Sequence, residues 1–217
     1  IVQHVFAGKE IASFKALSKP TRLEQQKIIL QLFNYRIADQ EAKSELELKA
    51  QRFAMLSTQP VYIMREVLQY LESRRIVIPG YTFLQDMVGR AVTRERNRIT
   101  NLLAHALSPA TKDQLEALLQ ADEQVYRISA LKREAKDFSY KELRQEVERR
   151  RFFQPLHEFA RTFLGTAGLS VESGKYFASL VKFYTVYKLQ RMAQGTTRLY
   201  LLCFAYHRFR QINDNLI

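Results

Sequence analysis

The 217-residue sequence has few of the residues that break helices or build covalent and metal sites. It contains one cysteine, Cys203, which excludes an internal disulfide and a zinc site made of cysteines. Glycine occurs seven times and proline five times, tryptophan is absent, and no G-x-G-x-x-G or G-K-[ST] string occurs. The scarcity of helix breakers favours long helices joined by short turns, and the missing strings exclude the common phosphate-binding loops.

The apolar content is that of a folded protein, since 47% of the residues are hydrophobic. No apolar run approaches the ~18 residues of a membrane span, and no signal peptide opens the chain. We therefore expect no membrane contact, and the single cysteine favours a reducing cytoplasmic location. Because the chain starts at Ile1 rather than Met and stops at Ile217 within a predicted helix, we also expect it to be a fragment.

The net charge of +12 is distributed unevenly along the chain. Residues 74–107 hold six basic and two acidic residues, and residues 174–217 hold seven and one. Between them, residues 108–148 hold seven basic and nine acidic residues. This pattern predicts two positive surfaces separated by an acidic-leaning spacer.

Capping signals predict an all-α, multi-helix fold. We expect Thr21 with Glu24, Thr82 with Gln85, and Ser139 with Glu142 to open helices, and we expect Asp39, Pro60 and Ser108-Pro109 to begin others. We expect no helix from Arg74 to Gly80, because three β-branched residues precede Pro79. The last segment, Val171 to Ile217, should form two aromatic-rich helices divided near Gly195, and we expect no strands.

The predicted helix from Thr82 has an apolar face and a separate basic and amide face. Its apolar face includes Leu84, Val88, Ile99 and Leu103, and Glu95 falls within that arc as a conflict. The other face carries Arg90, Arg94, Asn97, Arg98 and Asn101. Arginine and asparagine form bidentate contacts with phosphate and base edges, which suits DNA. A solvent-exposed helix face is the competing interpretation of the same pattern.

The residues predicted to contact DNA extend beyond this helix. The helix start at Thr82 offers free N–H groups to phosphate, and further cations precede it. The full set is Lys19, Arg22, Arg74, Arg75, Thr82, Arg90, Arg94, Asn97 and Arg98.

Catalytic chemistry finds little support in the sequence. The four histidines, His4, His105, His157 and His207, are isolated and do not have the i, i+4 spacing of a zinc pair. Most acidic residues, such as Glu142 and Glu146 near Arg149, are expected on solvated helix faces. We expect no catalytic residue, no metal site, no cofactor and no small-molecule substrate in this fragment.

Aromatic and basic residues are interleaved near the C-terminus, as in Lys182-Phe183-Tyr184 and Tyr206-His207-Arg208. The pattern fits either a base-stacking surface or a buried aromatic core, and the helical spacing of Phe177, Leu180, Val181 and Tyr184 favours the core. Arg149 to Arg151 is expected on an exposed face, and contact with a phosphate strand is the alternative.

Several strings, in order along the chain, resemble the large transposase of the Tn-three family of replicative bacterial transposons. They are Leu17–Ile29, Arg74–Tyr81, Leu84–Ala91, Lys136–Ser139, Lys175–Val181, Tyr200–Phe204 and Asn213–Ile217. The resemblance implies helical domains that bind double-stranded DNA at the terminal inverted repeats, in the bacterial nucleoid. It also implies an RNase-H-like catalytic domain with divalent metal, located beyond the end of this fragment.

The combined interpretation divides the chain into three parts. Residues 1–107 form a helical DNA-binding region, 108–138 a charged spacer with a short helix, and 139–217 an aromatic-rich helical region with possible end-pairing or homodimer contacts. The predicted function is non-enzymatic binding of transposon ends, to position them for the catalytic domain. The alternative is a dimerisation or scaffold module with no DNA affinity of its own.

Overall fold

The computed structural model describes residues 18–122 and 125–216, so His4 and Leu17 of the sequence interpretation lie outside the described residues. The fold is all-α, as predicted. The first helices are α2 (Lys19–Leu32), α3 (Gln40–Leu56), α4 (Pro60–Ser73), α5 (Tyr81–Ala106) and α6 (Pro109–Ala117). The later ones are α7 (Arg127–Lys132), α8 (Tyr140–Thr166), α9 (Val171–Phe183), α10 (Val186–Arg191) and α11 (Gln194–Leu216).

Three predicted helix starts are confirmed by hydrogen bonds. Asp39 accepts from the backbone N–H of Ala42, Ser108 from Thr111 and Ser139 from Glu142. Each side-chain oxygen satisfies one of the N–H groups that a helix leaves free in its first turn.

Two predicted caps are wrong. Ser18 caps α2 instead of Thr21, because the helix begins three residues earlier than predicted and places Pro20 in its first turn. At α5 the N-cap residue is Gly80, with no side-chain hydrogen bond, so Thr82 lies inside the first turn. The Arg74–Gly80 break itself is present between α4 and α5.

The C-terminal segment contains three helices rather than the two predicted. Thr185 caps the short helix α10, which separates α9 from α11, and Gly195 lies inside α11. The expectation of no strands is also wrong in detail. Ala121–Asp122 (β1) pairs antiparallel with Val125–Tyr126 (β2), and each of these strands has two residues.

The buried apolar residues form two clusters that share helix α5. The first cluster gathers α3, α4 and the start of α5, from Ala38 to Ala91. The second begins at Ile99 on the same helix and continues to Ile212. The predicted boundary at residue 107 therefore falls inside the second cluster, which also buries Leu115 and Ile128 of the expected spacer.

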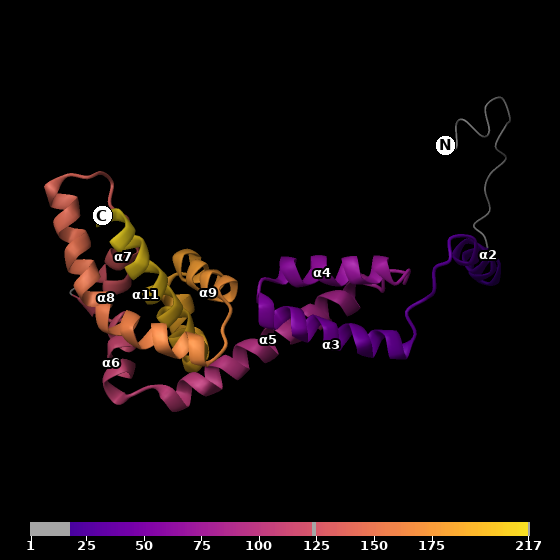
Figure 1. The fold of residues 1–217 in the computed structure, drawn as a ribbon, viewed down its shortest axis with the longest axis horizontal. Coiled ribbons are helices and arrows are strands. Elements are labelled where there is room, and N and C mark those ends of the chain that lie inside the picture. Colours follow the sequence, from indigo (N-terminus) through magenta and orange to yellow (C-terminus); the bar gives the residue numbers. More distant parts are fainter. Residues whose placement is uncertain (1–17, 123–124, 217) are drawn as a thin grey trace, which may run out of the picture.

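Figure 1 shows the resulting elongated arrangement, in which α5 runs from the first cluster into the second. We call the helices around the first cluster the first part and those around the second cluster the second part. In the second part, α11 packs against α8, α9 and α5. A buried hydrogen bond of 2.9 Å from the Thr58 backbone N–H to the Ser173 hydroxyl joins the α3–α4 connection to α9. The two parts therefore contact each other beside α5 as well as through it.

A buried ionic cluster joins α8 to α11. Arg208 Nη2 donates to Glu146 at 2.9 Å and to the carbonyl of Arg133 at 2.8 Å, and Arg149 also donates to Glu146. Glu142, Glu146 and Arg149 are all buried, so their predicted place on a solvated face is wrong. Their i, i+3 and i, i+4 spacing is the same on a solvated helix face and in a buried ionic cluster, so the spacing alone does not distinguish the two. Phe177 and Val181 lie in the core, as favoured.

None of the helices in residues 18–122 and 125–216 combines the length and the apolar character needed to cross a membrane.

Candidate nucleic-acid interface

A polar groove of about 1050 Å³ lies between α3 and α5. Helix α5 contributes most of its wall, because one face of the helix packs on α3 and α4 while the neighbouring face stays open. The lining residues include Glu47, Gln51, Asp86, Arg90, Arg94, Asn97, Arg98 and Asn101. The groove therefore collects four of the nine predicted DNA-contact residues, Arg90, Arg94, Asn97 and Arg98.

Arg98 does not present a free charge in this groove. Its guanidinium donates to both carboxylate oxygens of Glu95, from Nε at 2.9 Å and from Nη2 at 2.8 Å. Glu95 is buried, which resolves the conflict of an acidic residue in the apolar arc. These hydrogen bonds raise the pKa of Arg98 above its ordinary value.

Arg90 and Arg94 differ in their partners. Arg90 Nη2 lies 2.7 Å from a carboxylate oxygen of Glu47 on α3, with both side chains largely exposed. Such surface pairs are weak and exchange readily for another anion. Arg94 is exposed and forms no ion pair within the part of the chain that the structure describes. Asn97 lies one turn further along the same wall.

The remaining predicted contact residues lie outside the groove. Arg74 stacks over the Tyr70 ring at 5.8 Å, and Arg75 Nη1 donates to the Phe33 carbonyl at 3.1 Å. Both follow the C-terminus of α4. Lys19 and Arg22 are exposed on α2, and Thr82 is exposed in the first turn of α5.

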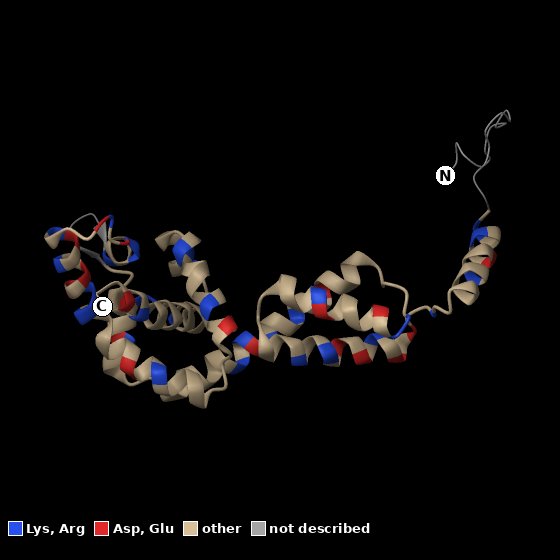
Figure 2. Ribbon diagram, turned by 45° about the horizontal axis from the view of Figure 1, so that its top comes forward, with Lys and Arg blue, Asp and Glu red and all other residues tan. Residues whose placement is uncertain are grey.

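Figure 2 shows that basic and acidic positions are mixed along the helices of the first part. The groove follows this pattern, with Arg90, Arg94 and Arg98 offset by Glu47 and Asp86. The regional excess of positive charge in the sequence therefore becomes a groove with a modest excess.

Glu47 and Gln51 complete the groove and were not identified from the sequence. They are one turn apart on α3, about 40 residues before the basic face, and polar i, i+4 positions on a helix are too common to stand out. Only the packing of α3 against α5 brings them to Arg90 and Arg94.

No cluster of three or more histidine, cysteine or acidic side chains suited to a metal ion occurs among the residues described here. Cys203 is free and fully buried, and burial raises the pKa of its thiol.

Comparison with known proteins gives one family match. No match was found among curated proteins. Residues 1–91 match the family model described as domain of unknown function (DUF4158), a domain found in transposases of the Tn-three family. The matched segment ends where the first hydrophobic cluster ends, at Ala91, and residues 92–217 lie outside it.

Proposed function

We propose that this chain is a non-catalytic part of a Tn-three-family transposase that binds double-stranded DNA at the transposon ends. Two lines support the proposal: the family match over residues 1–91 and the ordered resemblance along the rest of the chain. The observation that carries DNA binding is the wall of α5, where three arginines and two asparagines line one open groove.

The chemistry of this wall suits the edge of a duplex. Arginine and asparagine donate hydrogen bonds to phosphate oxygens, and their planar groups also form paired contacts with base edges. The wall runs from Arg90 to Asn101, twelve residues that span about 17 Å along the helix axis. That length spans several base pairs.

The acidic residues in the groove set the strength of binding. Glu47 must release Arg90 for that arginine to reach a phosphate, and the negative charge of Asp86 repels the phosphate backbone of the DNA. We therefore propose moderate affinity with steep salt dependence. Catalysis is proposed to reside in a separate, metal-dependent RNase-H-like domain of the transposase.

Fluorescence anisotropy with a labelled terminal-repeat duplex tests the proposal. We expect binding that weakens with salt by roughly one unit of log K per unit of log salt for each phosphate neutralised. The triple variant Arg90→Glu, Arg94→Glu, Arg98→Glu should abolish it. Binding that is unchanged in this variant contradicts the assignment. A scrambled duplex at the same salt separates base recognition from phosphate contact.

The second candidate is a scaffold module that pairs protein with protein and has no DNA affinity of its own. The observation that favours it is the amount of apolar side chain left on the surface, including Leu32, Phe33, Val61 and Tyr81. Anisotropy and light scattering on the same sample separate the two, because a stable dimer without DNA binding supports the scaffold.

A further inference from the structure

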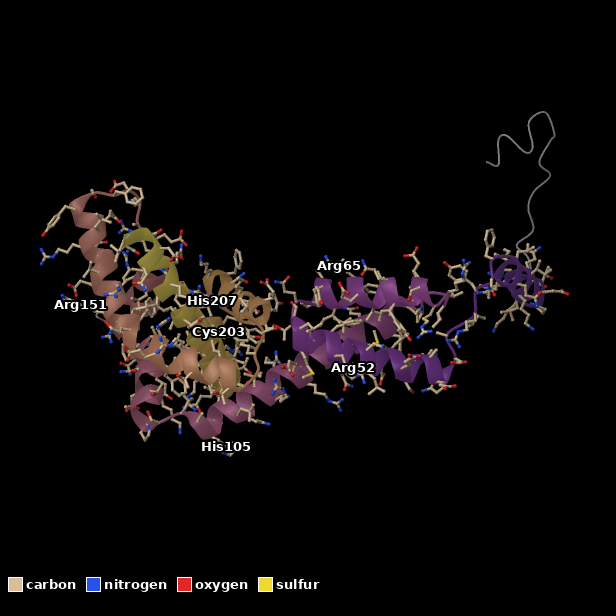
Figure 3. All side chains as sticks on the ribbon, in the orientation of Figure 1. Arg52, Arg65, His105, Arg151, Cys203 and His207 are labelled. Carbon is tan, nitrogen blue, oxygen red and sulfur yellow. The ribbon has the colours of Figure 1, made fainter. Side chains whose placement is uncertain are left out.

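A second groove, of about 1350 Å³, lies on the opposite face of the α4–α5 pair from α3 and is almost entirely apolar. We call it the apolar groove. Its walls are formed by Val61, Met64 and Leu68 of α4 and by Tyr81, Val88 and Val92 of α5. Val61 and Tyr81 are 80% and 73% exposed. Apolar side chains of this kind are usually buried in a helical bundle, but here they face solvent. Figure 3 shows Arg65, at the rim of this groove, projecting from α4.

Eight of the 14 residues of helix α2 are polar, but its apolar side chains are left largely uncovered by its own chain. None of its residues is buried, and Leu23, Ile29 and Leu32 are each more than half exposed. At 100° per residue, Leu23, Ile29, Leu30 and the C-cap residue Phe33 lie within an arc of about 120°. The polar residues Lys19, Arg22 and Gln26 share this arc. Figures 1 and 2 show α2 beyond the ends of α3 and α4, away from the rest of the chain.

The connection after α2 is hydrogen-bonded to the connection between α4 and α5. The Arg36 N–H donates to the Arg75 carbonyl and the Val77 N–H donates to the Arg36 carbonyl, both at 2.9 Å. Arg75 also donates its side chain to the carbonyl of Phe33. These bonds fix the end of α2 at one end of the apolar groove, with the helix directed outward.

We infer that the apolar groove is occupied by helix α2 of a second copy of this chain, in a symmetric pair that exchanges α2 helices. The inference does not use the polar groove, because the apolar groove lies on a different face of α5. It does involve α2, which carries Lys19 and Arg22 of the predicted DNA-contact set. An exchanged helix is a low-cost route to a dimer, since each contact is formed twice around one two-fold axis.

The dimensions of the two elements agree. The groove runs along α4 from Pro60 to Glu72, about 18 Å, and the 14 residues of α2 span about 21 Å. Ile29, Leu30 and Phe33 already line the end of the groove of their own chain. A second α2 in the groove therefore also packs against the first, which places the two helices beside the symmetry axis.

Cross-linking between two differently tagged chains tests the exchange directly. One chain carries Leu23→Cys on α2, and the other carries Val61→Cys in the groove wall. Cys203 is fully buried in the second part of the molecule (Figure 3), so the introduced thiols react selectively. We expect a disulfide-linked mixed pair in several-fold excess over the control mixture of Leu23→Cys with Val171→Cys. Val171 is 63% exposed and lies outside the groove.

Light scattering without DNA provides the second measurement. We expect the mass to rise from 25.5 kDa toward twice that value as concentration increases. Leu23→Glu and Val61→Glu should each shift the protein to monomer, while Val171→Glu leaves the dimer intact. All three sites are exposed, and circular dichroism checks that each variant remains folded.

Two results overturn the inference. The first is a monomer at every concentration up to about 100 times that used for anisotropy. The second is a double variant, Leu23→Cys with Val61→Cys in one chain, that forms its disulfide within the chain at high dilution. In either case the DNA-binding proposal is unaffected.

Discussion

Arg98 holds the buried carboxylate of Glu95 through two hydrogen bonds, at 2.9 and 2.8 Å, one turn along helix α5. This pair neutralises one of the three arginines that line the polar groove and leaves Arg94 as the unpaired one within the described residues. The three arginines are equivalent in the sequence but are unequal as DNA ligands.

Replacing Arg94 should therefore weaken DNA binding more than replacing Arg98. For Arg94→Ala we expect a roughly three- to ten-fold loss of affinity and a reduction of the salt slope by about one unit, because one phosphate contact is lost. For Arg98→Ala we expect a smaller effect on both. Anisotropy titrations at four salt concentrations measure the slopes.

Glu95→Gln provides the matched control for this comparison. The amide keeps the shape of the side chain and removes the charge that holds Arg98, so DNA affinity should increase. Equal losses for Arg94→Ala and Arg98→Ala, with no gain for Glu95→Gln, would contradict this account of the groove.

The buried pair of Arg208 and Glu146 should dominate the stability of the second part. Arg208→Met leaves Glu146 buried with fewer partners, and breaking a buried pair in this way costs about 3 kcal/mol of unfolding free energy. Urea denaturation followed by circular dichroism measures the loss. Arg210→Met, at an exposed arginine two residues away, should change stability by less than about 0.5 kcal/mol. Similar losses in both variants would show that the ionic cluster is not responsible.

Gly195 is required by a close contact between α11 and α5. A Cβ atom at this position would lie 2.5 Å from Cγ2 of Thr100, so Gly195→Ala should destabilise the protein by about 1–3 kcal/mol. Thr100→Ala removes that methyl group and should restore most of the stability in the double variant. Thermal unfolding of the two single variants and the double variant measures the coupling. Gly165→Ala, where nothing lies within 4 Å, should have no destabilising effect.

Stability should decrease as the pH falls from 7 to 5, because two histidines are held neutral. Burial, then Arg161 and Arg210, lowers the pKa of His157 below its usual 6.5, and burial lowers that of His207. The unfolded chain therefore binds more protons below pH 6.5, and the stabilisation is lost as the pH falls toward the lowered pKa values. Glu134 and Asp137 also have lowered pKa values, but they act below about pH 4.5.

Urea midpoints at pH 7, 6 and 5 test this dependence. His157 stacks on Phe209 with ring centroids 4.2 Å apart, so His157→Phe preserves the packing and removes the titration. Combined with His207→Gln, it should flatten the midpoint between pH 7 and 5. A dependence that persists in this double variant would assign the effect to other groups.

Helix locations were predictable because capping and periodicity are local properties. Asp39, Ser108 and Ser139 each open a helix as expected, since an N-cap hydrogen bond reaches only three residues along the chain. The predictions at Thr82 and Gly195 were wrong because neighbouring residues compete for the same role. Gly80, not Thr82, is the N-cap residue of α5. The C-terminal helices are separated on either side of α10 and not at Gly195.

Burial of charge was not predictable from the same local patterns. Glu146 and Arg149 have the spacing of a solvent-exposed pair, and only the approach of Arg208 on α11, 62 residues later, encloses them. The role of Glu47 in the groove was not predictable for the same reason, because its carboxylate pairs with Arg90 from a different helix, α3.

The sequence by itself determined the helical class, most helix starts and the basic face of α5, because these depend on residues within one or two turns of each other. The tertiary structure decided which charges remain free, where the two cores divide and which apolar surfaces stay uncovered. Those properties depend on contacts between helices that are distant in the chain, and no local pattern specifies them.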